Sequence, residues 1–213
     1  MTELRKARPG DETALRRLWE RVFGPETEFI EAFFKTLFVP ENTAAAELHG
    51  QIVSAAYGVD FGGYRYIYAV GTHPAYRGRG LGKAVTMLAA EGKPAYLTPA
   101  DESLRDWYVR EMGARPTWYR PVYPETGTLF PISPEEYAAR REALLRSVPH
   151  TVYPRGVMEL FSQYGAFWTD DAGAIRATAD GKVCEALPCT FTSEPYVYGL
   201  NGAEPIYWGL TLE

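Results

Sequence analysis

The stretch that decides the fold is the glycine-rich run Arg77-Gly78-Arg79-Gly80-Leu81-Gly82. Before it, every second position of residues 64–72 is taken by Tyr64, Tyr66, Tyr68, Val70 and Thr72, which is the period of a β-strand. After it, helical spacing is shown by Leu81, Ala84, Val85, Leu88 and Ala89, and Gly92 and Pro94 predict where that helix ends. The sequence therefore predicts a strand, a glycine-rich turn and a helix.

The composition of this turn favours a bound anion. Gly78, Gly80 and Gly82 let main-chain N–H groups approach a ligand without an obstructing Cβ, and a helix N-terminus adds partial positive charge there. Three basic side chains of the same run strengthen the preference for phosphate, namely Arg77, Arg79 and Lys83. The turn is thus a candidate phosphate cradle.

Two well-known phosphate-binding motifs do not fit this run. The nucleotide P-loop requires glycine at 77 and serine or threonine at 84, where this chain has Arg77 and Ala84. The dinucleotide fingerprint requires glycine at 83 or 85, where this chain has Lys83 and Val85. Both motifs are excluded.

The run resembles the Gln/Arg-x-x-Gly-x-Gly/Ala signature of the GCN5-related N-acetyltransferase (GNAT) superfamily, read here as Arg77-x-x-Gly80-x-Gly82. The preceding residues 70–76 are similar to the strand and turn that lead into that signature. The resemblance implies that acetyl-CoA is a co-substrate, with its pyrophosphate held by residues 77–83. It also implies that the main chain of Val70 and Thr72 binds the pantetheine arm.

The predicted order of elements matches that family over roughly residues 1–125. Strands are expected at 3–8, 43–48, 51–60, 64–72, 95–97 and 115–123, and helices begin after Asp11, Thr27, Gly80 and Thr98. Thr98-Pro99-Ala100-Asp101 fits a capping box. The predicted class is α/β (α+β), with the mixed central sheet and flanking helices of the GNAT acyl-CoA N-acyltransferase fold.

Proline and glycine mark a boundary after this segment, so the predicted domains are 1–125 and 133–213, joined by a linker at 126–132. Residues 133–164 predict two helices, and strands are expected at 166–170, 174–179, 182–189, 195–200 and 206–212. Asp180-Gly181 predicts a hairpin turn. This order repeats that of residues 11–60, so a partial, degenerate GNAT-like copy and an unrelated α+β unit are equally open.

Tyr108 is the candidate general acid. The resemblance implies a tyrosine four residues before a glycine on the helix after the fifth strand, which would protonate the departing thiolate. Here Tyr108 lies five residues before Gly113, and Trp107 holds the common spacing. One extra residue rotates a helical position by about 100°. A core aromatic without a chemical role is the alternative for Tyr108.

No general base is identified from the sequence. Asp60, Glu28 and Glu31 are candidates, each more often a solvated carboxylate, and catalysis by proximity with a water relay needs no named base. His73 beside the turn is expected to be structural. The three histidines share no metal-ligand spacing, so no metal is expected.

Composition limits the partners. The chain has 213 residues, a net charge of −5, two cysteines and 46% hydrophobic residues, which describes an ordinary globular protein in a reducing compartment. The net charge argues against nucleic acid, and no apolar run approaches about 18 residues, so no membrane partner is expected. A cytoplasmic location is expected, and a homodimer is left open.

The leading hypothesis is an acetyl-CoA-dependent N-acetyltransferase acting on a small-molecule, amino-acid or peptide amine. A non-catalytic acyl-CoA-binding or regulatory module is the alternative, and a structural protein whose turn binds nothing is a third. Tyr64, Tyr66 and Tyr68 share one face of their predicted strand. They either line an acceptor cleft or pack as a ladder beneath a helix.

Overall fold

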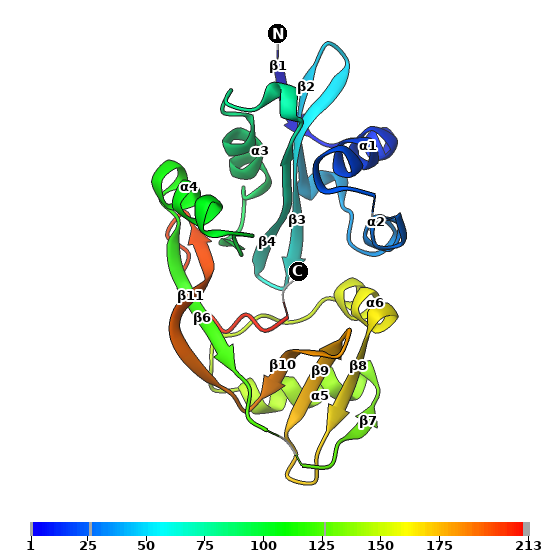
Figure 1. Ribbon diagram of the computed structural model, residues 1–213, viewed down its shortest axis with the longest axis vertical. Helices are drawn as coiled ribbons and strands as arrows, with labels where there is room; N and C mark the ends of the chain where they lie inside the picture. Colours follow the sequence, from blue (N-terminus) through cyan, green and yellow to red (C-terminus); the bar gives the residue numbers. More distant parts are fainter. Residues whose placement is uncertain (1, 26, 126, 211–213) are drawn as a thin grey trace.

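The computed structural model describes residues 2–25, 27–125 and 127–210, and its larger sheet has seven strands (Figure 1). These strands are β1 (Thr2–Lys6), β2 (Thr43–Leu48), β3 (Gln51–Phe61), β4 (Tyr64–Thr72), β5 (Ala95–Leu97), β6 (Arg115–Val122) and β11 (Thr190–Leu200). Their spatial order is β1-β2-β3-β4-β5-β11-β6. The β4–β5 pair is parallel and the other neighbours are antiparallel, so the mixed sheet is confirmed.

Helices cover both faces of this sheet (Figure 1). The first face packs against α1 (Glu12–Phe23) and α2 (Thr27–Thr36), and the second against α3 (Leu81–Ala89) and α4 (Glu102–Met112). The predicted helix starts after Asp11, Thr27 and Gly80 agree with these bounds within one residue. None of the helices in the described part of the chain is long and apolar enough to cross a membrane.

The two faces are packed with different kinds of side chain. On the α1–α2 face, the Trp19 ring lies 4.9 Å from Phe33 and 5.1 Å from Tyr57, centroid to centroid. On the α3–α4 face, small residues such as Ala44 and Ala56 are fully buried beneath α3. Small side chains let a helix approach a sheet closely, so α3 and the glycine run before it are held near the strands.

Arg65 fixes the far end of α3. Its guanidinium is buried and donates to the carbonyl oxygens of Ala89 (3.1 Å) and Glu91 (3.0 Å), near the C-terminus of that helix. Terminal carbonyls lack partners within a helix, and a cation at that end also complements the helix dipole. Asp60 balances the charge by accepting from Arg65 Nε at 2.8 Å. Arg65 therefore positions α3 through its C-terminus, at the opposite end of the helix from the glycine run.

A smaller antiparallel sheet lies beyond β6, at the other end of the molecule (Figure 1). Its strands, in the spatial order β10-β9-β8-β7, are β7 (Phe130–Ile132), β8 (Gly165–Thr169), β9 (Ile175–Ala179) and β10 (Lys182–Leu187). They accompany α5 (Pro134–Leu145) and α6 (Arg155–Tyr164). The expected order of two helices and a hairpin is confirmed, and Asp180 and Gly181 both have positive φ (49° and 73°) at the turn.

The last long strand returns to the larger sheet. β11 pairs with β5 on one side and β6 on the other, although residues 123–189 separate it from β6. The smaller sheet is therefore inserted between two neighbouring strands of the larger one. The division into 1–125 and 133–213 stays a prediction, but residues 190–200 extend the N-terminal sheet and β7 lies within the expected linker.

The end of the chain does not form the expected strand as far as it is described. Tyr207 makes an isolated bridge with His150, and residues 211–212 of the expected strand lie outside the described residues. Whether residues 133–213 are a degenerate copy of the first unit stays a prediction. Figure 1 shows this last segment running back across the molecule toward β3 and β4.

Candidate functional site

The glycine run forms an open turn at the N-terminus of α3. Gly78 and Gly80 have φ values of 74° and 75°, and Gly80 is the N-cap of the helix. A Cβ at either position would meet no atom within 4 Å. The first N–H groups of a helix have no acceptor within it, so they are available to a ligand in this open space. The predicted phosphate-binding residues 77–83 are thus brought together at one helix terminus.

The turn before the run is built from local contacts. His73 Nδ1 accepts from the Ala75 N–H at 3.2 Å, and Arg77 Nε donates to the Thr72 carbonyl at 3.2 Å. The Arg79 guanidinium lies 5.2 Å from the centre of the Tyr76 ring. His73 therefore stabilises the turn, which agrees with its expected structural role, and Arg77 contacts one of the two predicted pantetheine-binding residues.

A bulge in β4 interrupts the simple alternation of residues 64–72. Ala69 has a φ of 45°, and the pairing with β3 shifts there, with Tyr57 opposite Tyr68 and Ala55 opposite Gly71. Tyr68 packs on the α1–α2 face, whereas Val70 joins the core beneath α3. The period-2 pattern that aligned Val70 with the tyrosines is wrong beyond Ala69, because a bulge adds one residue to one strand only.

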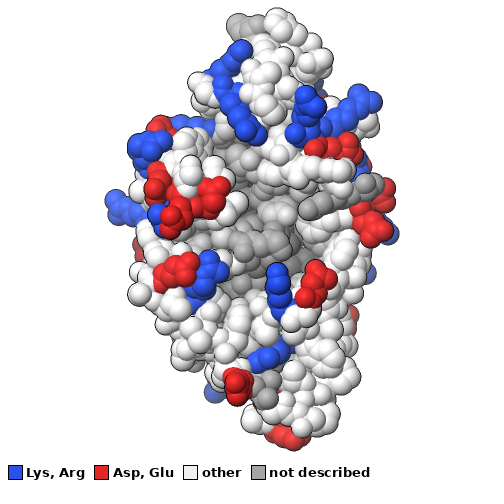
Figure 2. Space-filling model, in the orientation of Figure 1, with Lys and Arg blue, Asp and Glu red and all other residues white. Residues whose placement is uncertain are grey.

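A cavity of about 750 Å³ lies where β4 and β5 diverge. The two strands pair only at Arg65–Ala95 and Tyr66–Tyr96. From that point on, residues 66–70 of β4 and residues 97–102, at and after the end of β5, form parts of the cavity wall. Figure 2 shows the same side of the molecule hollowed near its centre, with acidic and basic side chains around the hollow. Strand divergence therefore makes a ligand-sized opening in the sheet.

The segment after β5 brings a hydroxyl without a partner into this wall. Asp101, not Thr98, is the N-cap of α4, because its carboxylate accepts from the Leu104 N–H at 2.8 Å. The expected cap at Thr98 is wrong. Thr98 Oγ1 is buried and has no hydrogen-bond partner among the described residues. An unsatisfied buried polar atom costs roughly 1–3 kcal/mol, so Thr98 is suited to a ligand that bonds to it.

Tyr108 lies in the wall of the same cavity. Its side chain is 7% exposed, and burial raises the pKa of its phenol above the ordinary range. Trp107 instead points toward α3, since a Cβ at Gly82 would lie 4.0 Å from Trp107 Cη2. The structure thus brings Tyr108, and not the residue at the common family spacing, to the cavity. Its role as an acid stays a prediction.

The carboxylates considered as bases lie elsewhere. Asp60 is bound by Arg65 and by Lys93 Nζ at 2.9 Å. Glu28 and Glu31 line a separate cavity between α2 and α6. None of the three lines the main cavity. Its carboxylates come from Asp101, Glu102 and Glu194, and Glu194 forms an ion pair with Arg120 at 3.1 Å.

The residues that β11 contributes to the cavity were not foreseen. Glu194, Pro195, Tyr196 and Tyr198 line it together with Arg120 of β6. The β11 residues follow those of β4 by more than a hundred positions, and no local pattern links the two segments. The return of β11 to the larger sheet brings them together.

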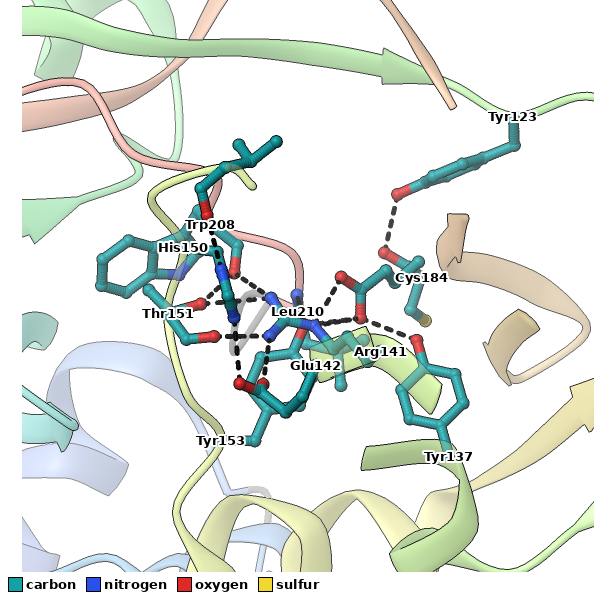
Figure 3. A network of polar contacts seen from close by, with 12 residues as sticks. Tyr123, Tyr137, Arg141, Glu142, His150, Thr151, Tyr153, Cys184, Trp208 and Leu210 are labelled. Carbon is teal, nitrogen blue, oxygen red and sulfur yellow. Dashed lines mark hydrogen bonds and ion pairs between the residues drawn. The ribbon is translucent and has the colours of Figure 1, made fainter. Parts of the chain in front are cut away.

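A buried polar network joins the smaller sheet to the end of the chain (Figure 3). Arg141 Nε of α5 lies 3.0 Å from Glu185 Oε1 of β10, and neither side chain is exposed. Tyr137 and Tyr153 donate their hydroxyls to Glu185 at 2.7 and 2.6 Å. Burial is the main reason that the pKa values of both phenols are raised well above the ordinary range.

The same network holds residues 208–210 against the cavity wall. Tyr153 accepts from the Leu210 N–H at 2.6 Å, and Arg141 Nη2 donates to the Trp208 carbonyl at 3.3 Å. The Trp208 ring lies 5.2 Å from Tyr66 and 5.1 Å from Tyr96. Tyr66 also lines the cavity. The smaller sheet and its helices therefore support the cavity wall through Trp208. No pattern in the sequence predicts this contact.

Comparison with known proteins supports the family resemblance. Residues 11–114 match the family model described as the acetyltransferase (GNAT) family. Residues 11–114 belong to the GNAT family. They include the glycine run, the bulged strand β4 and the helix with Tyr108, so the cavity that they line is the candidate active site. No curated protein sequence gives a match.

Solved structures share the fold of this chain. A putative acetyltransferase from Pyrococcus horikoshii is 14% identical with a TM-score of 0.60, covering 87% of this chain and 70% of its own. A GCN5-related N-acetyltransferase from Kribbella flavida is 15% identical with a TM-score of 0.60, covering 92% and 58%. Eis1 from Mycobacterium abscessus is 16% identical with a TM-score of 0.56, covering 83% and 53%. The chain thus spans little more than half the length of the last two.

Proposed function

We propose that this protein is an acetyl-CoA-dependent N-acetyltransferase that moves the acetyl group directly from coenzyme A to an amine. The observation that carries the proposal is a combination of two features. An open turn at Gly78 and Gly80 begins α3, and a cavity of about 750 Å³ between β4 and β5 has the buried Tyr108 in its wall. An anion site and an acid are the two groups that thioester aminolysis needs from this fold.

The residues fit acetyl-CoA as a substrate. Arg77, Arg79 and the N–H groups at the start of α3 would hold the pyrophosphate, and Lys83 lies in the first turn of the same helix. The orphan hydroxyl of Thr98 would bond to the ligand within the cavity. Val70 lines the cavity together with Thr98, and Thr72 contacts Arg77 of the glycine run, so main-chain contacts of these two residues with the pantetheine arm would connect the two groups.

The proposed reaction is a single displacement. The amine lone pair forms a C–N bond to the thioester carbonyl carbon, and the C–S bond breaks. Tyr108 donates its proton to the departing thiolate and is reprotonated from water, while the proton lost by the amine passes to solvent. A phenol is protonated at neutral pH, and burial raises the pKa of Tyr108 further, so its acid form is the one present. Alignment of amine and thioester supplies the rest of the acceleration.

The test has two stages. Isothermal titration calorimetry with acetyl-CoA should show binding, and release of free thiol should then follow on addition of amines. Binding without turnover of any amine, peptide or aminoglycoside would favour the non-catalytic acyl-CoA-binding module instead. No binding of acetyl-CoA or coenzyme A would contradict both functions.

A further inference from the structure

The cavity between β4 and β5 has two chemically different halves. One half faces α4 and includes Asp101, Glu102 and Arg105. The other half lies toward α1 and is formed by aromatic side chains, namely Trp19, Phe23, Tyr66, Tyr68 and Tyr196, which we call the aromatic half. The glycine run belongs to the α3–α4 side. A cofactor bound at that run would leave the aromatic half to the acceptor.

Three rings of the aromatic half are accessible, since Phe23 is 46% exposed and Tyr68 and Tyr196 are half-buried, whereas Trp19 and Tyr66 are buried. The Trp19 ring lies 5.8 Å from both Phe23 and Tyr68, and Tyr66 stacks on Tyr68 at 6.3 Å. Gly71 leaves room for the Phe23 ring, because a Cβ there would lie 3.1 Å from Phe23 Cε2. Such rings gain from contact with another ring in edge or offset geometry, beyond the gain from burying apolar area.

Charge is confined to the rim of this half. Among the cavity residues that the structure describes, those from α1 and β4 are all uncharged. The nearest charges on β6 and β11, Arg120 and Glu194, pair with each other at 3.1 Å, and Arg120 lies 4.8 Å from the Tyr196 ring centre. A polycationic acceptor would need several unpaired carboxylates to replace its hydration. The aromatic half is therefore ill-suited to polyamines and aminoglycosides.

We infer that the acceptor is a primary amine carried on an aromatic group, an arylalkylamine, whose ring occupies the aromatic half. This inference rests on the proposed function. The ring packs on the exposed Phe23 ring and against the half-buried Tyr68 and Tyr196, and the short alkyl arm carries the nitrogen toward the thioester at the bulge of β4. The amine enters the reaction as the neutral base, so C–N formation and C–S cleavage yield the N-acetyl amide and coenzyme A.

A competition among amines tests the acceptor class. Thiol release from acetyl-CoA should give a kcat/KM for 2-phenylethylamine about tenfold or more above that for n-hexylamine, spermidine or kanamycin. A higher kcat/KM for spermidine or kanamycin would agree with the proposed acetyltransferase function but overturn the arylalkylamine class. An equal kcat/KM for n-hexylamine and 2-phenylethylamine would do the same. Acetyl-CoA binding with no turnover of any amine would overturn both, and absence of acetyl-CoA binding would overturn the proposed function at its first step.

A pair of variants tests the location. Phe23 is 46% exposed at the end of α1, so Phe23→Ala should fold and should raise the KM for 2-phenylethylamine about tenfold, with the acetyl-CoA affinity unchanged. Phe130→Ala on β7 removes an equally exposed ring (44%) outside the cavity lining and should leave both constants unchanged. No change in KM with Phe23→Ala, or the same change with Phe130→Ala, would overturn the aromatic half as the acceptor site.

Discussion

Arg141 and Glu185 form an ion pair with a nitrogen to oxygen distance of 3.0 Å, and both side chains are fully buried. Tyr137 and Tyr153 add hydrogen bonds to the same carboxylate. Such a pair makes removal of one partner costly, because the other charge stays in a low-dielectric interior. The pair also connects α5 and β10 to the segment that carries Trp208.

Arg141→Met should lower the free energy of unfolding by about 3–5 kcal/mol, because Glu185 is left buried without its cation. Urea denaturation followed by circular dichroism measures the loss. Arg140→Met is the matched control, since Arg140 pairs with Glu136 on the exposed side of the same helix, where a pair contributes about 0.3–0.5 kcal/mol. Equal losses in the two variants would contradict a special role for the buried pair.

Gly80→Asp should abolish acetyl-CoA binding. Gly80 has a φ of 75°, which strains any L-residue by roughly 1–2 kcal/mol, and the new carboxylate would face the pyrophosphate. Gly50→Asp is the control, because Gly50 has a φ of 77° and equally open surroundings in the β2–β3 turn. Calorimetry should find binding lost in the first variant and kept in the second. Unchanged acetyl-CoA binding by Gly80→Asp would show that the glycine run does not bind the cofactor.

The glycine run and the order of elements around it could be predicted from sequence because their signals are local. Turn residues, caps and apolar periodicity located β2, β3 and β4 within one residue at each end. The bulge at Ala69 was missed because one inserted residue leaves no trace in a nine-residue alternation. The place of β11 in the larger sheet and the Arg141–Glu185 pair were missed because both depend on contacts between distant segments.

Tyr108→Phe should reduce kcat by about 10²–10⁴-fold with unchanged acetyl-CoA affinity, since the proton for the thiolate is lost and the packed ring is kept. Stopped-flow thiol release and calorimetry measure the two quantities. Tyr123→Phe is the control, because Tyr123 donates to the Cys184 carbonyl and does not line the cavity. Full activity of Tyr108→Phe would show that the acid is another group.

The pH dependence of kcat follows from the burial of Tyr108. A free phenol loses its proton near about pH 10, and burial raises the pKa of Tyr108 above that value. The acid form is therefore kept as the pH rises, and kcat with saturating amine should not fall between about pH 8 and 10. A decline centred below about pH 9, absent from Tyr108→Phe, would show that the phenol titrates early and would contradict this prediction.

Gly209→Ala tests whether the buried network supports the active site. Gly209 has a φ of 84°, and a Cβ there would clash with Tyr153 and Glu185 and lie 2.8 Å from Arg141 Nη2. Since the adjacent Trp208 packs on Tyr66 of the cavity wall, displacement of this segment should lower kcat/KM as well as stability. Gly202→Ala has similar backbone strain (φ of 75°) in open surroundings and should lose only roughly 1–2 kcal/mol of stability with normal turnover. Loss of stability without loss of activity in Gly209→Ala, measured well below its unfolding temperature, would show that the network holds the smaller sheet together but does not position the cavity.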